Sequence, residues 1–193
     1  MYSLFTQLSK FAEPIVTNLL LCGPRSSGKT IFLEYLKRFD SKPSSIPTTT
    51  PSYGLNIVHF TNRLFPRNPF RFWELPGDDS FSDLWGDYAR KSHALLYFIP
   101  VNPSPSCLSI FHSVSGLVHG CPIAFVVTSP VEIDQDEFLA ISQLVLACVS
   151  ESQLRSATVH KFVTTSGQGM DEIIQYFVQK LIYTKTLRRI EED

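Results

Sequence analysis

The sequence predicts an α/β fold in which a six-stranded, mostly parallel sheet lies between helices on both of its faces. Short apolar runs recur along the chain and are typical of buried parallel strands. Amphipathic stretches with helical spacing lie between most of these runs. The order is a strand, a helix, a hairpin and then strands alternating with helices, which favours a mostly parallel sheet.

The expected strands are four buried apolar runs and one hairpin. The buried runs are residues 15–22, 95–101, 123–128 and 160–164. The hairpin joins residues 55–61 to residues 70–75 through a polar turn that holds Pro66 and Asn68. Residues 41–52 are rich in Ser, Thr and Pro and are expected to form a loop.

The expected helices are amphipathic stretches at residues 29–39, 107–119, 135–149 and 171–187. Asp134 is expected to cap the N-terminus of the third helix. The residues expected to share the buried face of that helix are Phe138, Ile141, Leu144 and Val145. The last helix carries the strongest apolar stripe, at positions 173, 174, 177, 178, 181 and 182.

The composition fits a globular protein and argues against several other classes. The 193 residues are 44% hydrophobic and 18% charged, which argues against a disordered chain. A net charge of -1 provides no basic field, so no nucleic-acid partner is expected. No apolar run reaches the roughly 18–20 residues that span a bilayer. The four cysteines form no CxxC pair and are expected to be buried thiols in a reducing compartment.

The segment from Gly23 to Thr30 reads GPRSSGKT and fits the pattern GxxxxGK followed by Ser or Thr. In such a P-loop the backbone N–H groups turn inward around phosphate, and the positive end of the following helix points at it. Lys29 is expected to reach the terminal phosphates, and the Thr30 hydroxyl is expected to bind Mg²⁺. The phosphate contacts expected here are Gly23, Arg25, Ser26, Ser27, Gly28, Lys29, Thr30 and Ile31.

Segments along nearly the whole chain resemble one protein family, the Arf-family small GTPases. The matching segments are Gly28 to Glu34, Thr48 to Thr50, Gly54 to Ile57, Phe72 to Gly77, Leu84 with Trp85 and Tyr88, and Thr164 to Gly167. They are similar to the family's first helix, its switch I and switch II regions and its last nucleotide loop. Phe72 to Gly77 stands where the family has a Trp-Asp-x-Gly-Gly run.

Two segments, Met1 to Phe5 and switch I, are most similar in sequence to the Arf-related branch of the Golgi. That branch begins with Met-Tyr instead of a myristoylated glycine. Two alternatives stay open: other divergent Arf-like branches, and the β subunit of the signal-recognition-particle receptor, which also carries Leu-Pro-Gly at positions 75–77.

The resemblance implies a P-loop small-GTPase fold, GTP or GDP and Mg²⁺ as cofactors, and a switch in Golgi or vesicle trafficking. The implied location is cytoplasmic and peripheral on the Golgi or endomembranes. Switch I, from Thr48 to Asn56, and switch II, from Gly77 to Tyr88, would bind effector or regulator proteins. The implied metal contacts are Thr30, Ser52 and, through water, Glu74. The implied nucleotide contacts outside the P-loop are Gly77, Thr128, Ser129, Thr165 and Ser166.

Switch II departs from the family pattern at three positions. Glu74 replaces an Asp and keeps the charge for a water-mediated Mg²⁺ contact, but with a longer reach. Pro76 replaces a glycine, which removes one donor and stiffens the segment. Asp78 stands at the catalytic position of the Gln that orients the attacking water, and a carboxylate cannot donate a hydrogen bond at neutral pH. We therefore expect intrinsic hydrolysis to be very slow or absent, and enzymatic activity stays open.

Two other segments depart from the pattern. In switch I, Ser52 stands at the Mg²⁺-sensing threonine, with Thr50 as its competitor. In the base-recognition loop, Thr128 to Val131 replace Asn-Lys-x-Asp. Val131 cannot accept the hydrogen bonds that the family's Asp takes from guanine, and Asp134 is out of register. Much of the guanine preference is therefore expected to be lost.

Residues 1–13 are expected to form a short amphipathic helix ahead of the domain at residues 14–190. Its apolar face would consist of Leu4, Phe5, Leu8 and Phe11. In Arf-like proteins such a helix enters a membrane surface when GTP binds, and the Met-Tyr branch implies an acetylated N-terminus read by a membrane-protein receptor. The alternative is a helix packed permanently on the domain. Tyr2 excludes N-myristoylation, and no secretory signal is expected.

The sequence therefore supports two functions from different classes. The first is a divergent Arf-like GTP-binding switch, which the intact P-loop favours. The second is a pseudo-GTPase interaction module with relaxed or lost nucleotide binding, which the changes in switch II and in the base-recognition loop favour.

Overall fold

The computed structural model describes residues 16–38, 54–61, 69–77, 82–118 and 120–183. Six strands form one sheet in the order β2-β3-β1-β4-β5-β6. The strands are β1 (Thr17–Cys22), β2 (Asn56–Phe60), β3 (Phe70–Glu74), β4 (Ala94–Pro100), β5 (Ile123–Ser129) and β6 (Ala157–Val163). β2 is antiparallel to β3, and every other neighbouring pair is parallel. The predicted α/β class and the mostly parallel six-stranded sheet are confirmed.

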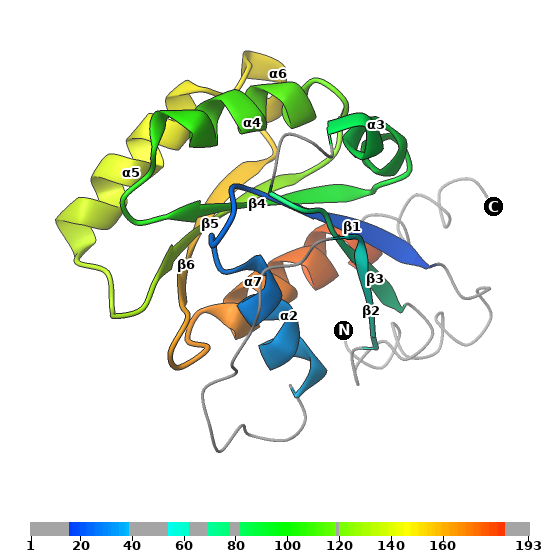
Figure 1. Cartoon of the computed structure of the whole chain (residues 1–193), viewed down its shortest axis with the longest axis horizontal. Coiled ribbons are helices and arrows are strands. Elements are labelled where there is room, and N and C mark those ends of the chain that lie inside the picture. The colour runs from blue at the N-terminus through cyan, green and yellow to red at the C-terminus, as the bar shows by residue number, and fades with distance from the viewer. Residues whose placement is uncertain (1–15, 39–53, 62–68, 78–81, 119, 184–193) are drawn as a thin grey trace.

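Helices cover both faces of this sheet, as Figure 1 shows. The helices are α2 (Lys29–Lys37), α3 (Ser82–Arg90), α4 (Pro105–Ser115), α5 (Gln135–Ala147), α6 (Glu151–Leu154) and α7 (Met170–Phe177), which continues as the π-helix η2 (Val178–Tyr183). α2 and α7 pack on one face, and α3, α4 and α5 pack on the other. The arrangement follows from parallel strands, because each crossover must carry the chain back over a face of the sheet.

The central strand β4 divides the buried side chains into two cores. Because side chains alternate along a strand, Leu96 and Phe98 pack with α2 and α7, whereas Tyr97 and Ile99 pack under α3, α4 and α5. In the first core the ring of Phe32 on α2 lies 5.4 Å from the ring of Phe98, edge to face. This packing holds α2 against the sheet and thereby fixes the position of the loop between β1 and α2.

The structure differs from the sequence-based expectation in a few elements. β6 begins at Ala157, ahead of the expected start at residue 160, and α3 and α6 were not predicted as helices. Leu144 was expected on the buried face of α5, but 44% of it is exposed while its neighbour Val145 is buried. The predicted cap is confirmed, because Asp134 Oδ1 accepts a hydrogen bond of 2.9 Å from the N–H of Asp136.

Several predicted features lie outside the described residues. These are the N-terminal helix, the loop at 41–52, the hairpin turn, and the predicted site residues Ser52 and Asp78. Among the residues that are described, no helix is long and apolar enough to cross a membrane. Cys22 and Cys107 are buried as expected, whereas Cys121 and Cys148 are half-buried.

Candidate functional site

The P-loop connects β1 to α2 at the carboxyl edge of the sheet. Gly23 has a φ of +140°, and a Cβ at this position would lie 2.3 Å from the carbonyl oxygen of Phe98. Glycine is therefore required where the loop leaves the strand. The loop also holds Ser26 at a φ of +62° and ends at Gly28, the residue before the first turn of α2.

Lys29 lies inside this loop, with 6% of its surface exposed. Its Nζ donates hydrogen bonds to the carbonyl oxygens of Gly23 at 2.7 Å and Pro24 at 2.8 Å, and to Ser27 Oγ at 3.3 Å. Burial lowers the pKa of Lys29 from its ordinary 10.5 to about 8, although the charge of Glu74 opposes this. An ammonium group held in this way gains stability when an anion arrives beside it.

Thr30, the next residue, is connected by hydrogen bonds to β3 directly and to β2 through Glu74. Its Oγ1 donates a hydrogen bond to Glu74 Oε1 at the end of β3. The second carboxylate oxygen, Oε2, accepts a hydrogen bond of 3.0 Å from Asn56 Nδ2 at the start of β2. Glu74 is 1% exposed, so both of its oxygens are engaged inside the protein.

This arrangement fits Mg²⁺ at the predicted position. A hydroxyl whose proton is held by a carboxylate keeps its oxygen lone pairs for another partner, and hydroxyl oxygen suits this hard cation. The described residues contain no group of three or more His, Cys, Asp or Glu side chains that could hold a metal ion. Thr30 would therefore hold Mg²⁺ together with phosphate oxygens, which is how this ion is commonly bound.

The start of switch II lies directly against the P-loop. The N–H of Leu75 donates a hydrogen bond of 3.1 Å to the carbonyl oxygen of Leu21, which continues the β1–β3 pairing. A Cβ at Gly77 would lie 2.5 Å from both the backbone nitrogen of Arg25 and the carbonyl oxygen of Gly23. This close approach to the P-loop explains why glycine stands here.

On the other side of the loop, Thr128 ties the end of β5 to the P-loop. Its Oγ1 donates hydrogen bonds of 3.1 Å to the carbonyl oxygen of Ser27 and 3.3 Å to that of Ile99. Thr128 is 5% exposed. Its methyl group and that of Thr164 would each lie 3.3 Å from a Cβ at Gly28. Thr128 and Thr164 thus pack against the P-loop at Gly28, and Thr128 also bonds to it at Ser27.

The two loops expected to read the base are joined to each other. The N–H and Oγ1 of Thr164 donate to the carbonyl oxygen of Ser129, at 2.8 and 3.2 Å. Thr165 Oγ1 donates to the carbonyl oxygen of Pro130 at 2.6 Å. From α2, the hydroxyl of Tyr35 donates to the carbonyl oxygen of Thr165 at 2.8 Å. These bonds hold the loops rigidly beside the P-loop.

The comparison with curated proteins agrees with this geometry. The chain is 25% identical to the ADP-ribosylation factor-related protein 1 of Homo sapiens over 192 residues, and the match covers 94% of each chain. The protein of the same name from Rattus norvegicus is 26% identical over 194 residues, again with 94% of each chain covered. The chain is thus similar over nearly its whole length to ADP-ribosylation factor-related proteins. No protein-family model matches it.

The hydroxyl groups at the expected base-recognition loops have partners within the chain. Ser129 Oγ accepts a hydrogen bond of 3.2 Å from the N–H of Val131, and Ser166 Oγ accepts one of 3.3 Å from the N–H of Gln168. Val131, at the position of the family's guanine-binding Asp, is 67% exposed. Asp134 is engaged in capping α5. The hydroxyl groups predicted to contact the nucleotide therefore also organise the loops.

The structure adds residues to the candidate site that sequence reasoning had not assigned to it. Asn56 was expected only as the end of switch I, and Thr164 only within the last loop. Tyr35 was not singled out, and no local pattern could have indicated it, because its partner Thr165 lies 130 positions away. For Asn56 the signal was the Gly-Leu-Asn-Ile match, which marks the segment without revealing its contact with Glu74.

Proposed function

We propose that the protein binds GTP or GDP with Mg²⁺ and acts as a switch in Golgi or vesicle trafficking, with very slow or no intrinsic hydrolysis. The observation that carries this proposal is the buried ammonium of Lys29 inside a formed P-loop, next to the Thr30 hydroxyl held by Glu74. Positive charge and a cation-binding oxygen side by side are what a polyphosphate requires.

Each group has a defined task in this proposal. Lys29 Nζ would exchange part of its carbonyl contacts for phosphate oxygens, and the inward backbone N–H groups of the P-loop would donate to the others. Bound Mg²⁺ would neutralise phosphate charge beside Thr30. Gly77 would meet the terminal phosphate, since its backbone already touches the loop. Pro76 has no backbone N–H, and the Asp78 carboxylate cannot donate a hydrogen bond to the attacking water, so hydrolysis would be slow.

The nucleotide proposal is tested by identifying what the protein carries. The protein is purified in Mg²⁺ buffer and denatured, and the released nucleotide is separated by anion-exchange chromatography. We expect GTP or GDP near one equivalent, lost in Lys29→Ala and retained in Lys37→Ala, an exposed lysine on the same helix. A stable, folded protein that carries no nucleotide and binds none would contradict the proposal.

A second candidate function, the pseudo-GTPase interaction module, is favoured by the base-recognition loop. There the hydroxyl groups bond to protein, and Val131 offers no acceptor for guanine. The two candidates differ in a competition experiment with a fluorescent guanine nucleotide. Displacement by GTP well ahead of ATP supports the switch, whereas equal displacement, or no binding, supports the module.

Slow hydrolysis is tested separately by a single-turnover assay on protein loaded with radiolabelled GTP. Asp78→Gln restores the side chain that orients water, so we expect this variant to hydrolyse GTP faster than the natural protein. Hydrolysis by the unaltered protein at the ordinary rate of the family, with a partner present, would refute the expectation.

The partners follow from the same proposal. Switch I and switch II would bind effector or regulator proteins, and the segment at residues 1–13 would bind a membrane surface or a membrane-protein receptor. The protein would then be cytoplasmic and peripheral on the Golgi or endomembranes. The test is liposome flotation and cellular localisation of a Phe5→Ala, Leu8→Ala double variant, compared with Thr6→Ala, Ser9→Ala on the opposite face. Unchanged localisation of the apolar variant would rule out the membrane role.

A further inference from the structure

β6 lies at one edge of the sheet. The strand order ends with β6, and among the described segments no strand pairs with its outer side. Figure 1 shows β6 at the rim of the sheet, and its two faces are covered by α5 and α7. An edge strand presents a row of backbone N–H and C=O groups that another strand can pair with.

The hydrogen bonds at both ends of β6 show which groups face outward. The N–H of Ile123 bonds to the carbonyl oxygen of Ser156, and the N–H of Thr164 bonds to the carbonyl oxygen of Ser129. Residues 156 and 164 therefore face β5. Because backbone groups alternate in direction along a strand, residues 157, 159, 161 and 163 face outward. The N–H of Val163 confirms this, since it bonds to Gln168 in the following loop.

The following loop closes part of this edge and leaves part of it open. A Cβ at Gly169 would lie 2.0 Å from the carbonyl oxygen of Lys161, so that oxygen is covered. The N–H of Val163 is taken by Gln168 at 3.0 Å. Within the part of the chain that the structure describes, no loop bonds to the N–H and C=O of Val159 or to the N–H of Lys161, and these groups form the open stretch. In an antiparallel pair, one residue placed opposite Val159 would exchange two hydrogen bonds with it.

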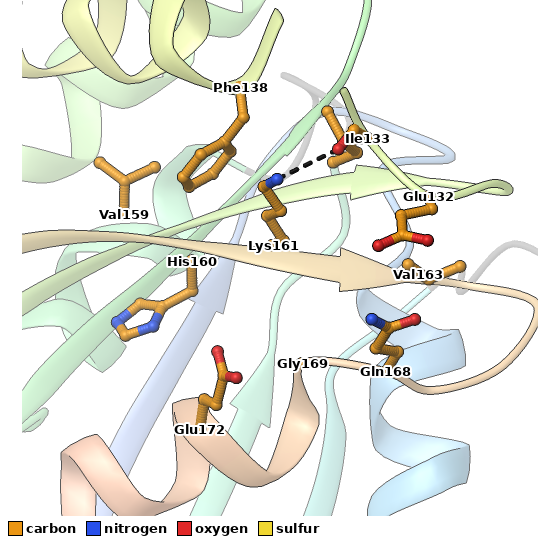
Figure 2. Close-up of a pocket in the computed structure, with 10 residues that line it drawn as sticks. All are labelled: Glu132, Ile133, Phe138, Val159, His160, Lys161, Val163, Gln168, Gly169 and Glu172. Atoms are coloured by element: carbon orange, nitrogen blue, oxygen red, sulfur yellow. Dashed lines mark hydrogen bonds between the residues drawn. The ribbon is translucent and has the colours of Figure 1, made fainter. Parts of the chain in front are cut away.

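A pocket of about 240 Å³ lies at this stretch. Figure 2 shows that it includes both faces of the strand. Val159 and Lys161 point toward Phe138 on α5, and His160 points the other way, toward Glu172 on α7. The pocket therefore provides space for the side chains of an added strand on both sides of its backbone.

The pocket is lined by two carboxylates, Glu132 and Glu172, and one ammonium, Lys161, so its net charge is negative. Lys161 Nζ donates hydrogen bonds of 3.1 Å to two neutral acceptors, the carbonyl oxygen of Ile133 and Gln135 Oε1. It also lies 4.8 Å from the centre of the Phe138 ring. Glu132 is exposed and lines the same pocket, and within the described residues no salt bridge or hydrogen bond is recorded for its carboxylate.

Glu172, on the opposite side of β6, is likewise exposed, and the described residues provide no salt bridge or hydrogen bond for it. His160 faces it, and burial lowers the pKa of His160 below its ordinary value, although the charge of Glu172 opposes this. A largely neutral imidazole, with Nε2 3.0 Å from Thr158 Oγ1, does not neutralise the carboxylate.

We propose that the outer edge of β6 binds an extended, basic segment of a partner protein, which adds a strand beside Val159 and places its cationic side chains against Glu132 and Glu172. The backbone pattern requires a polypeptide, and the two carboxylates require positive charge. Side chains alternate along a strand, and Figure 2 shows Glu132 and Glu172 on opposite sides of β6. An added strand with a Lys or Arg side chain on each of its faces would therefore direct one cation toward each carboxylate.

The test uses the full chain and a blocked hexapeptide, acetyl-Thr-Val-Arg-Arg-Val-Thr-amide. Binding is followed by amide hydrogen exchange and by fluorescence anisotropy of a labelled copy. We expect the exchange of the Val159 and Lys161 amides to slow at least tenfold on saturation, while amides elsewhere in the protein are unchanged. A copy with Glu-Glu in place of Arg-Arg should bind at least tenfold more weakly, and so should a copy with alternate amides N-methylated.

Paired variants separate the carboxylates from general electrostatics. Glu132→Gln with Glu172→Gln should weaken the arginine peptide about tenfold or more, whereas Glu137→Gln with Glu151→Gln, which removes the same charge elsewhere, should not. Three results would each overturn the proposal: no binding at millimolar peptide, equal binding of the N-methylated peptide, or protection of the two amides that rises with protein concentration alone. The last result would mean that a second copy of this chain occupies the edge.

Discussion

The lowered pKa of Lys29 predicts that phosphate binding weakens in mildly alkaline solution. Without ligand the pKa is about 8, because the ammonium is buried in the P-loop. A bound polyphosphate favours the charged form and would return the pKa to its ordinary range. The charged fraction of Lys29 in the free protein falls about eightfold between about pH 7.5 and about pH 9. The affinity for GDP should fall by the same factor, with uptake of about 0.9 proton per GDP at about pH 9.

The assay is titration calorimetry with GDP and Mg²⁺ in two buffers of different ionisation enthalpy, which yields both the affinity and the number of protons bound. Far-UV circular dichroism at each pH checks that the fold is unchanged. In Lys29→Met the binding should be weak and its pH dependence should disappear. An affinity that is constant or rises over this range, with proton uptake below about 0.2 per GDP, would refute the reasoning.

The same pKa has a consequence of opposite sign for stability. In the unfolded chain Lys29 has its ordinary pKa of 10.5, so between about pH 8 and 10.5 the unfolded state binds more protons than the folded state. The free energy of unfolding of the ligand-free protein should therefore rise with pH across this window. A lowering from 10.5 to about 8 corresponds to about 3 kcal/mol at about 1.4 kcal/mol per pH unit. The free protein gains stability over the range in which it loses ligand affinity.

Three further predictions concern single side chains. Asn56→Ala removes the hydrogen bond to buried Glu74, and urea unfolding should show a loss of about 1.5–3 kcal/mol; a loss within error would contradict the role of this contact. Thr128→Val leaves the carbonyl oxygen of Ser27 without its partner, and thermal unfolding should show a cost of about 1–3 kcal/mol. The control variant Thr61→Val, at an exposed position, should not share this cost. Val131→Asp supplies the acceptor that guanine needs, so competition against a labelled nucleotide should improve GTP over ATP by about tenfold or more; an unchanged ratio would mean that the loop cannot reach the base.

The parts of the fold that were predicted are those specified by residues close together in sequence. The P-loop was found because its residues are contiguous and lie between a strand and a helix. Asp134 was identified as a cap because capping depends on the next two or three residues. The bond from Tyr35 to Thr165 and the bond from Asn56 to Glu74 join segments whose proximity depends on the assembled sheet, so no local pattern contains them.

Leu144 shows a second limit, which is geometric. Phe138, Ile141 and Val145 form the stripe by which α5 rests on the sheet. At 3.6 residues per turn, Leu144 lies roughly 90° from the centre of that stripe, on its flank. Whether a flanking position is covered depends on how close the neighbouring helix lies, which the periodicity of α5 does not encode. The structure leaves 44% of Leu144 exposed.

The pairing of Asn56 with Glu74 makes the candidate metal site sensitive to the alignment of a hairpin. Asn56 stands directly opposite Glu74 in the antiparallel β2–β3 register. If β2 slid by two residues along β3, the same face of the strand would still point inward, but another side chain would stand opposite the carboxylate. Glu74 would then lose the amide that holds its second oxygen, while Thr30 would keep its bond to the first. A shift in the register of the hairpin would thus change the contacts of Glu74 beside Thr30, although the backbone of neither residue would move.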